Sequence, residues 1–197
     1  MLNITSTFSN HIFYSISLKS DIRGPNSLPD VLIRGLPITD ERLAAYGLLD
    51  WILTTNFNAS INDLTKDELG CPRCKSEFKF WVSIAHSGNF VAASASALGP
   101  IGIDLESFYS WDESIEDLVL TVQEKKYVDA ANDRARVGTR FWVRKEALGK
   151  ALGIGIDDSV LSSSTENIST TAEGKTFFLR DLDAPDDYCA ALSFAFF

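Results

Sequence analysis

Hydrophobic and polar positions along the chain follow two periods, one typical of strands and the other of helices. Residues 11–19 alternate as a half-buried strand does. Apolar residues at helical spacing predict a helix over roughly residues 40–54, with Thr39 or Asp40 as its N-cap. The stripe of this helix consists of Leu43, Leu48, Trp51 and Ile52. Further apolar runs predict strands at residues 80–85, 90–97, 101–105 and 176–179, and a terminal strand within 188–197.

The second half of the chain carries two more helical patterns. One covers about residues 114–131, and the other covers about 139–152, where Gly153 and Gly155 stop it. Residues 21–38 contain several prolines and glycines and are predicted to form a loop. Each half thus combines strands with one main helix, so we expect an α+β fold that is compatible with a duplicated unit.

Composition narrows the class of protein. The chain has 197 residues, 45% hydrophobic and 23% charged, which is typical of a globular domain and not of a disordered chain. The net charge of -9 argues against a general nucleic-acid binder, because a phosphate backbone needs a basic surface. No stretch is long enough to span a bilayer, and residues 1–5 lack the features of a signal peptide. Three cysteines cannot all pair, which favours a reducing, cytoplasmic location.

The strand Gly102-Ile-Asp104-Leu-Glu106 carries the first candidate chemistry. Residues two apart on a strand share a face, so Asp104 and Glu106 point the same way. Two neighbouring carboxylates repel unless a cation lies between them, and oxygen ligands suit Mg²⁺. The alternative is the ordinary polar face of a half-buried strand.

The second candidate for chemistry lies on the predicted helix Phe141-Trp-Val-Arg-Lys145-Glu146-Ala-Leu-Gly149-Lys150. Glu146 and Lys150 lie on one face, and Gly149 is unfavourable inside a helix by roughly 1 kcal/mol unless a ligand or another backbone approaches it. From Arg134 to Lys150 there are six basic residues and one acid, Glu146, which suggests an anionic ligand such as phosphate. An exposed Glu–Lys pair that merely supports the helix is the alternative.

His86 and Ser87 lie at a predicted strand–turn–strand. Either side chain can donate to a phosphate, or it can cap the turn. A Ser–His hydrolase is excluded by the absence of a Gly-x-Ser-x-Gly motif. Cys71-Pro-Arg-Cys74 is half of a zinc motif without its second pair, so structural zinc is not expected.

These three clusters, in this order, resemble the 4′-phosphopantetheinyl transferases, and most closely the Sfp-type branch. The family combines a Gly-Ile/Val-Asp-x-Glu strand with a Trp-x-x-Lys-Glu-x-x-x-Lys helix about forty residues later; here Asp104 and Glu146 are 42 residues apart. The resemblance covers roughly residues 39–155. It implies two similar α+β halves that form a pseudo-dimer within one chain, residues 1–98 and 99–197, with the active site between them.

The resemblance also implies an activity. Such an enzyme moves the 4′-phosphopantetheine arm of coenzyme A to a serine of an apo acyl or peptidyl carrier protein and releases 3′,5′-ADP, often in secondary metabolite biosynthesis. It implies Mg²⁺, with Mn²⁺ as a substitute, and a monomeric enzyme with no nucleic-acid or membrane partner. A Mg²⁺-dependent phosphohydrolase and an inactive coenzyme A-binding scaffold are the alternatives.

Roles follow residue by residue from the matching motif positions. Glu146 matches the general base, and Lys150 matches the lysine at the pyrophosphate that assists the leaving group. The matching metal ligands are Asp104, Glu106 and Glu146, and the matching coenzyme A contacts are Arg42, Gly70, Pro72, His86, Ser87, Lys145 and Lys150.

Two positions depart from the family pattern. Ala85 stands where the family commonly has serine, and Cys71 stands where it commonly has lysine. Each change removes a contact to phosphate or ribose. Coenzyme A affinity is then either reduced or restored by another basic residue, for which Arg73 and Lys75 are the candidates.

Overall fold

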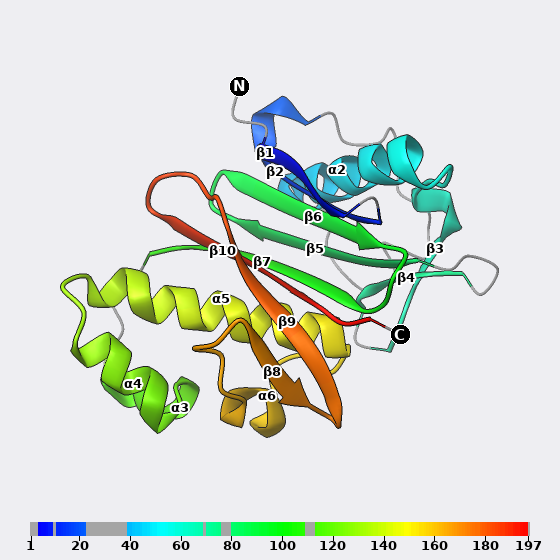
Figure 1. Ribbon diagram of the computed structural model, residues 1–197. Coiled ribbons are helices and arrows are strands. Elements are labelled where there is room, and N and C mark those ends of the chain that lie inside the picture. The colour runs from blue at the N-terminus through cyan, green and yellow to red at the C-terminus, as the bar shows by residue number, and fades with distance from the viewer. Residues whose placement is uncertain are drawn as a thin grey trace.

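The computed structural model describes residues 4–22 except residue 10, 39–75 except residue 69, 80–108 and 113–196, with the backbone alone over 4–9. Residues 23–38 of the predicted loop lie outside the described residues. Two antiparallel four-stranded sheets form the centre of the molecule, with a long helix on the outer side of each (Figure 1). The α+β class predicted from the sequence is confirmed.

The N-terminal sheet has the order β1-β2-β6-β5. Its strands are β1 (Ile4–Ser9), β2 (Ile12–Leu18), β5 (Trp81–Ser87) and β6 (Phe90–Ser96). Helix α2 (Asp40–Asn56) packs on this sheet and begins as predicted, because the Thr39 side chain accepts a hydrogen bond from the Arg42 N–H. Trp51, which we placed on the buried stripe, is 46% exposed, whereas Leu48 and Ile52 are buried.

A short hairpin extends from the end of α2 toward the second half. After a 3-10 turn at Ile61–Asp63 come β3 (Leu64–Lys66) and β4 (Pro72–Cys74), which pair antiparallel with Lys66 opposite Pro72. A similar turn follows β2 at Lys19–Asp21. The hairpin contacts β5 through β4, so its connecting loop lies beside the centre of the molecule.

The C-terminal sheet has the order β7-β10-β9-β8. Its strands are β7 (Ile101–Ser107), β8 (Ser169–Ala172), β9 (Lys175–Leu182) and β10 (Tyr188–Phe194). The helices between β7 and β8 are α3 (Glu113–Val119), α4 (Val122–Asp129), α5 (Arg134–Leu152) and α6 (Asp158–Ser162). Only α5 packs extensively on the sheet, against β7 and β10.

Two helix predictions need correction. The single helix expected near residues 114–131 is two helices, because Thr121 caps a new one with a reciprocal Thr121–Glu124 capping box. Helix α5 begins at Arg134, before the predicted residue 139, because Asp133 caps it. Its end is as predicted: Gly153 takes a left-handed conformation with φ 77°.

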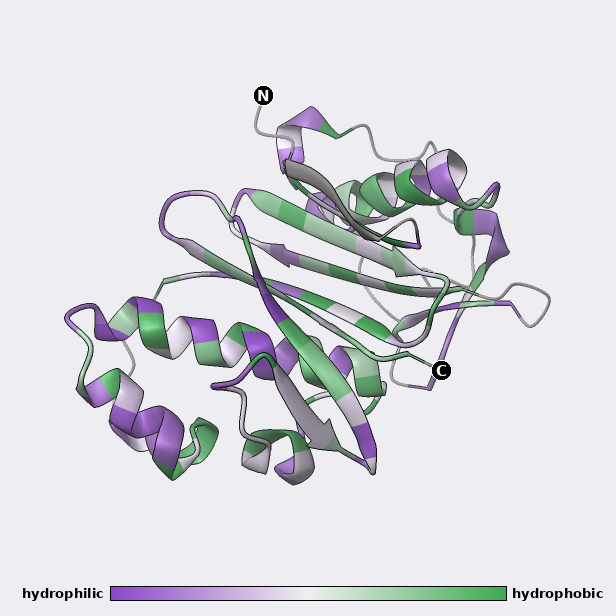
Figure 2. Ribbon diagram, in the orientation of Figure 1, coloured by the Kyte–Doolittle hydropathy of each residue, from purple (hydrophilic) through white to green (hydrophobic). Residues whose placement is uncertain are grey.

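The core lies in layers. One cluster fills the space between α2 and the N-terminal sheet, and another joins the inner faces of the two sheets, where Ile16 and Ala92 meet Ile103 and Leu192. Figure 2 shows hydrophobic residues concentrated on the central strands, whereas α4 is largely hydrophilic. No helix in the described part of the chain is long and apolar enough to cross a membrane.

The two halves repeat one arrangement. In the first, β2, α2, β5 and β6 follow one another and the strands lie in the order β2-β6-β5; in the second, β7, α5, β9 and β10 give the order β7-β10-β9. This repeat agrees with the expectation of similar halves. The pseudo-dimer itself and the boundary at residues 98/99, which falls between β6 and β7, stay predictions.

Candidate active site

A cleft of about 310 Å³ lies where α2, the β3–β4 loop, β5, β7 and α5 come together. Eight of the residues predicted for the site line it: Arg42, Gly70, Pro72, His86, Asp104, Glu106, Glu146 and Lys150. These residues come from positions up to 108 apart in the sequence, since Arg42 and Lys150 are the outermost. The fold therefore collects the three sequence clusters into one place.

Lys150 and Asp104 form the central ion pair of the cleft. Lys150 Nζ donates to Asp104 Oδ1 at 2.7 Å, to the Ile103 carbonyl at 3.2 Å and to the Ile84 carbonyl at 3.4 Å. An ammonium has three N–H donors, so all of them are used. Because Ile84 belongs to β5 and Ile103 to β7, this one side chain ties the two sheets together.

The other oxygen of Asp104 is left open. Asp104 Oδ2 is buried and has no hydrogen-bond partner. A buried carboxylate oxygen without a partner is costly, and such atoms commonly mark a place for an ion or a ligand. Lys150 thus binds one oxygen of Asp104, and the other oxygen is buried without a donor in a residue that lines the cleft.

Charge around Lys150 keeps it protonated. Burial by itself lowers the pKa of a lysine, but the Asp104 carboxylate, with help from Glu146 and Glu106, outweighs burial and raises the pKa of Lys150 above its ordinary value. Lys150 is therefore a cation at physiological pH.

Glu106 follows Asp104 on the same face of β7 and is held by Ser87. The Ser87 hydroxyl donates to Glu106 Oε2 at 2.8 Å and accepts from the Ser107 N–H at 3.3 Å. Burial raises the pKa of Glu106, and the nearby Asp104 charge adds to the rise while Ser87 opposes it. Ser87 thus orients an acid and is not among the residues that line the cleft; its predicted contact with coenzyme A stays a prediction.

Glu146 reaches the same cleft from α5. Burial, and after it the repulsion of Asp104, raises the pKa of Glu146 from 4.5 to about 7. A carboxyl group with a pKa near neutrality can exchange a proton at physiological pH, as a general base requires. The sequence alone offered no sign of this shift, since burial of Glu146 depends on how closely α5 approaches β7.

Two glycines permit that close approach. A Cβ on Gly102 would lie 2.0 Å from the Ala147 carbonyl oxygen of α5, and a Cβ on Gly149 would lie 2.3 Å from the Gly155 carbonyl oxygen. No side chain fits at either distance. The predicted close contact at Gly149 is therefore real, and its partner is the backbone that follows the helix. The equivalent role of Gly102 was missed in the sequence, although it belongs to the strand motif.

The donor set suits a hard divalent cation in its chemistry. Asp104 Oδ2 is an open buried oxygen, and the carboxylates of Glu106 and Glu146 have raised pKa values that a cation would reverse. In the described residues, however, no three His, Cys, Asp or Glu side chains are already arranged as a metal site. Mg²⁺ typically uses few protein ligands and completes its shell with phosphate oxygens and water. The assignment of a metal to these acids stays a prediction.

The predicted nucleotide contacts Arg42, His86, Gly70 and Pro72 also line the cleft. Partial burial, together with the charges of Lys150 and Arg42, lowers the pKa of His86, so it is a neutral hydrogen-bond donor at pH 7. Gly70 takes a left-handed conformation with φ 80°, which turns the loop so that Gly70 and Pro72 both face the cleft.

One predicted coenzyme A contact is wrong. The Lys145 side chain is 0% exposed; it pairs with the equally buried Glu124 at 3.0 Å and donates to the carbonyls of Leu161 and Ser163. It lies away from the cleft because residues one apart on a helix point about 100° apart, and Glu146 is the one that faces β7. Lys145 instead anchors α5 to α4 and to the segment after α6.

Glu124 was missed in the sequence analysis. It accepts from Thr121 and from the Thr165 N–H and hydroxyl, so every oxygen of this buried acid is used. Nearby, Arg144 forms a bidentate ion pair with Asp181. The Thr121-x-x-Glu124 spacing of a capping box was the available signal for the helix start, but nothing in the sequence paired it with Lys145.

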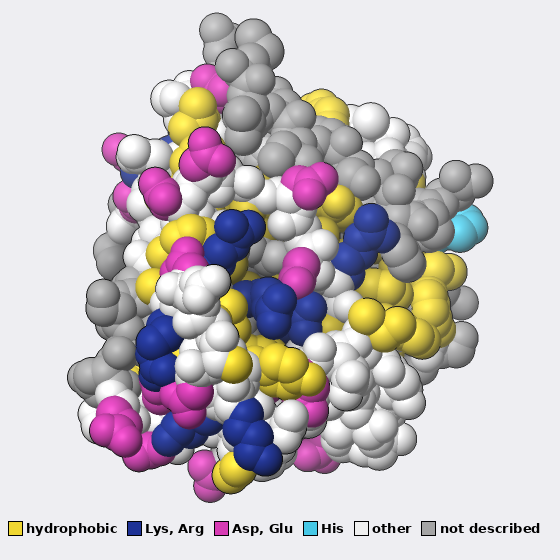
Figure 3. Space-filling view, turned by 60° about the vertical axis from the view of Figure 1, so that its left-hand side comes forward, with side chains coloured by type: hydrophobic (Ala, Val, Ile, Leu, Met, Phe, Trp, Pro, Cys, Tyr) yellow, Lys and Arg dark blue, Asp and Glu magenta, His cyan; other side chains and the backbone are white. Residues whose placement is uncertain are grey.

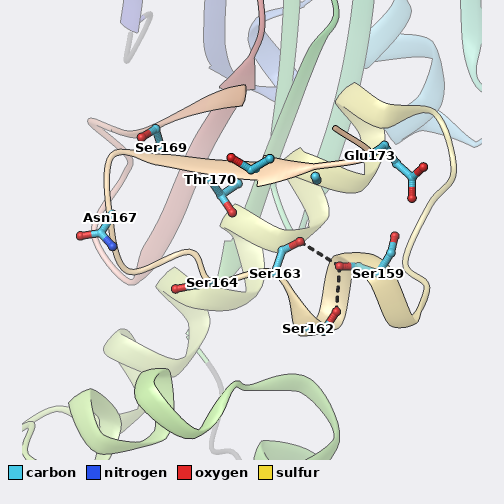
Figure 4. Close-up of a pocket in the computed structure, with 10 residues that line it drawn as sticks. Ser159, Ser162, Ser163, Ser164, Asn167, Ser169, Thr170 and Glu173 are labelled. Carbon is cyan, nitrogen blue, oxygen red and sulfur yellow. Dashed lines mark hydrogen bonds between the residues drawn. The ribbon is translucent and has the colours of Figure 1, made fainter. Parts of the chain in front are cut away.

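Two larger cavities lie elsewhere. One of about 500 Å³, between α6 and β8, is lined mainly by hydroxyl groups; Ser162 and Ser163 both donate to the Ser159 carbonyl there (Figure 4). Another of about 670 Å³ lies between the start of α5 and the β9–β10 connection. Neither contains a residue predicted for the site.

Figure 3 shows Lys and Arg side chains gathered in the middle of one face and bordered by acids, so positive charge is local in this acidic protein.

Comparisons with known proteins fall on the same region. Residues 100–193 match the family model of the 4′-phosphopantetheinyl transferase superfamily. The chain is 28% identical over 130 residues to 4′-phosphopantetheinyl transferase AcpT of Salmonella typhi, which covers 64% of this chain and 67% of that protein. The AcpT of Salmonella typhimurium (strain LT2) gives the same values.

Solved structures of holo-[acyl-carrier-protein] synthase (AcpS) are also similar. The protein from Neisseria meningitidis is 19% identical with a TM-score of 0.42, over 50% of this chain and 98% of that one. The protein from Thermotoga maritima is 20% identical with a TM-score of 0.39, over 50% and 63%. The family match includes all the acids of the cleft and Lys150. The part of the chain that carries these residues, 100–193, is thus similar to the 4′-phosphopantetheinyl transferase superfamily.

Proposed function

We propose that this protein transfers the 4′-phosphopantetheine arm of coenzyme A to a serine of an apo carrier protein and releases 3′,5′-ADP. One observation carries the proposal: a single cleft is lined by three carboxylates and Lys150 together with Arg42, His86 and the Gly70–Pro72 turn. The acids are suited to a cation that binds a pyrophosphate. The basic and neutral donors are suited to a nucleotide. The family match and the names of the relatives support the same activity.

Glu146 is the proposed general base. Its pKa of about 7 lets it accept the proton of the attacking serine hydroxyl, and positioned bases of this kind contribute roughly 10²- to 10⁴-fold to a rate. Asp104 and Lys150 lie beside it and hold opposite charges close to the same point. The serine oxygen attacks the β-phosphorus of coenzyme A, the bond from that phosphorus to the bridging oxygen breaks, and 3′,5′-ADP leaves with the electron pair.

Asp104, Glu106 and Glu146 are the residues that would hold Mg²⁺, or Mn²⁺ in its place. When bound, the cation supplies positive charge to the pyrophosphate oxygens. Lys150 sets the orientation of Asp104 in the structure as it stands, and Ser87 sets that of Glu106. In the proposal, Lys150 also contacts the pyrophosphate, for which it must share a donor now given to a backbone carbonyl.

Arg42, His86 and the Gly70–Pro72 turn are the proposed contacts of the nucleotide. His86 contributes a neutral N–H, because partial burial, and after it the charge of Lys150, lowers its pKa. Arg73 lies in the same part of the cleft but is already paired with Asp67 at 2.8 Å. Recognition of coenzyme A by Arg73 would therefore compete with an existing ion pair.

The cellular setting belongs to the proposal as well. We place the enzyme in the Sfp-type branch, as a cytoplasmic monomer that acts on an acyl or peptidyl carrier protein of secondary metabolite biosynthesis. The three free cysteines, Cys71, Cys74 and Cys189, support a reducing compartment. Local basic patches on an acidic protein support docking of an acidic partner through short-range complementarity.

The test is to incubate apo carrier protein with coenzyme A, Mg²⁺ and the enzyme, and to measure the intact mass of the carrier. A gain of one phosphopantetheine arm, together with release of 3′,5′-ADP, is expected. Hydrolysis of coenzyme A with an unmodified carrier would instead identify a phosphohydrolase. Binding of coenzyme A with neither reaction, across a panel of carriers, would identify a scaffold. A carrier with its serine changed to alanine is the control.

A further inference from the structure

Lys66, at the end of β3, has a buried ammonium group with no hydrogen-bond partner. Other lysines near the cleft are engaged: Lys150 pairs with Asp104, and Lys75 donates to the Asn62 carbonyl. A buried ammonium carries three donors and a full charge, so leaving all of them unused is unfavourable. The position is therefore one that an anion would stabilise.

Asp67, the acid next to Lys66 in the sequence, already accepts hydrogen bonds from other residues. Asp67 accepts from Arg73 Nε and from the Cys71 N–H, each at 2.8 Å, and thus uses both of its oxygens. Burial lowers the pKa of Lys66, the positive charge of Arg42 lowers it further, and the Cys71 thiol opposes both. A buried ammonium without a hydrogen-bond partner, close enough to a second cation to feel its charge, is a position that an anion would stabilise.

Lys66 is not itself a lining residue of the cleft, but it lies directly beside one. It is the direct cross-strand partner of Pro72, which lines the cleft, and directly opposed residues of an antiparallel pair point to the same face. Arg42, which interacts with Lys66, lines the cleft from α2. The four-carbon stem of a lysine lets its ammonium move toward a ligand without movement of the backbone.

The residue at position 71, in the turn beside Lys66, gives a reason why this chain would use the Lys66 ammonium. Cys71 stands where the resemblance predicts a lysine, and its thiol lies within electrostatic reach of Lys66, Arg73 and Lys150. Of the two substitutes considered from the sequence, Lys75 is held by a carbonyl and Arg73 by Asp67. Among the lysines and arginines that the structure describes beside this turn, Lys66 is the one whose ammonium has no hydrogen-bond partner.

We propose that Lys66, together with Arg42, forms the subsite for the phosphate monoester on the ribose of coenzyme A, in place of the lysine missing at residue 71. The inference rests on the proposed function for the identity of the nucleotide. The monoester is the fitting group, because in the proposed function the pyrophosphate belongs with Lys150 and the three acids. A dianionic phosphate offers three oxygens to the unused donors.

Binding measurements on Lys66→Met separate this role from a structural one. Titration calorimetry with 3′,5′-ADP and 5′-AMP should show that the wild-type protein prefers 3′,5′-ADP, and that Lys66→Met weakens 3′,5′-ADP binding by roughly 10- to 100-fold while 5′-AMP binding changes little. In steady-state assays KM should rise for coenzyme A and not for dephospho-coenzyme A, with kcat nearly constant. Lys75→Ala, outside the cleft, should bind both nucleotides as the wild type does.

A second variant tests the substitution of one lysine for another. Lys66→Met/Cys71→Lys should recover most of the lost affinity for 3′,5′-ADP. Lys66→Met should also unfold at a urea concentration no lower than the wild type, because it removes an unpaired buried charge. Equal loss for 3′,5′-ADP and 5′-AMP, no loss for either, or clear destabilisation would overturn the proposal. Preferential binding of 3′,5′-ADP that depends on Lys66, in a protein that modifies no carrier, would keep the subsite and refute the transferase.

Discussion

Lys150 on α5 and Asp104 on β7 form an ion pair at 2.7 Å that uses one oxygen of the aspartate and leaves the other buried without a partner. The same ammonium contacts the backbone of both sheets. The pair therefore serves two purposes: it fixes how the halves of the cleft meet, and it presents an oxygen that only a ligand or an ion can satisfy.

Removal of Lys150 should affect both purposes. Lys150→Met leaves the buried Asp104 carboxylate without its partner, so we expect the free energy of unfolding to fall by roughly 3 kcal/mol in urea titrations. Carrier modification should slow by roughly 100-fold or more. Lys126→Ala, on the exposed side of α4, is the control and should change stability by less than about 0.5 kcal/mol. Unchanged turnover of Lys150→Met would remove the lysine from the mechanism.

Glu146→Gln should abolish activity and yet stabilise the protein above neutral pH. The pKa of Glu146 is raised to about 7 in the fold, so between about pH 4.5 and 7 the folded state holds a proton that the unfolded chain has lost. Stability contributed by this group therefore falls as pH rises through that window. Gln carries no such charge, and we expect it to add up to about 3 kcal/mol at pH 8.

The check is urea unfolding of both proteins at pH 5 and pH 8. The difference between Glu146→Gln and wild type should be small at pH 5 and largest at pH 8. A difference of the same size at both values would show that burial of the charge is not its cause. Turnover close to wild type would exclude Glu146 as the base, whatever its effect on stability.

Lys145 should matter for folding and little for coenzyme A. Lys145→Met strips the fully buried Glu124 of its counter-ion, so we expect a loss of roughly 3–5 kcal/mol. The folded fraction should bind coenzyme A with an affinity within about threefold of wild type. Lys125→Ala breaks the more exposed pair with Asp117 and should cost less than about 1 kcal/mol. A large loss of coenzyme A affinity with normal stability would restore Lys145 to the binding site.

Gly102→Ala should separate α5 from β7. The added methyl group would meet the Ala147 carbonyl at 2.0 Å, and backbone cannot yield cheaply. We expect destabilisation by more than about 2 kcal/mol and a weaker response of thermal stability to Mg²⁺. Gly174→Ala is the control: it faces open space, so the left-handed φ of 70° at this position is its only expected cost, about 1 kcal/mol. Equal effects of the two variants would contradict the packing role of Gly102.

The sequence was informative where local pattern decides the structure. The N-cap at Thr39, the end of α5 at Gly153 and the cost of Gly149 all depend on neighbours in the chain, and all were predicted. The motif spacing placed Asp104, Glu106, Glu146 and Lys150, which do share one cleft.

Pairings over long distances were not predictable. Lys145 and Glu146 are neighbours in one helical motif, so the sequence does not show which of them faces the cleft. Lys145 is buried because Glu124 on α4 lies opposite its side chain. Lys66 gave no signal, because its lack of a partner depends on Asp67 being taken by Arg73. Trp51 fits the helical period but is exposed because the stripe on α2 turns toward the sheet at Leu48 and Ile52.

Of the two backbone carbonyls that Lys150 contacts, one belongs to the N-terminal sheet. Ile84 reaches the lysine of the ion pair with its carbonyl oxygen, so no exchange of its side chain can delete that interaction. Alanine scanning of the N-terminal sheet would for this reason undercount how much that sheet contributes to the chemistry. Replacing the peptide group itself, for example by an ester at the next residue to weaken the carbonyl, is the kind of change that would expose it.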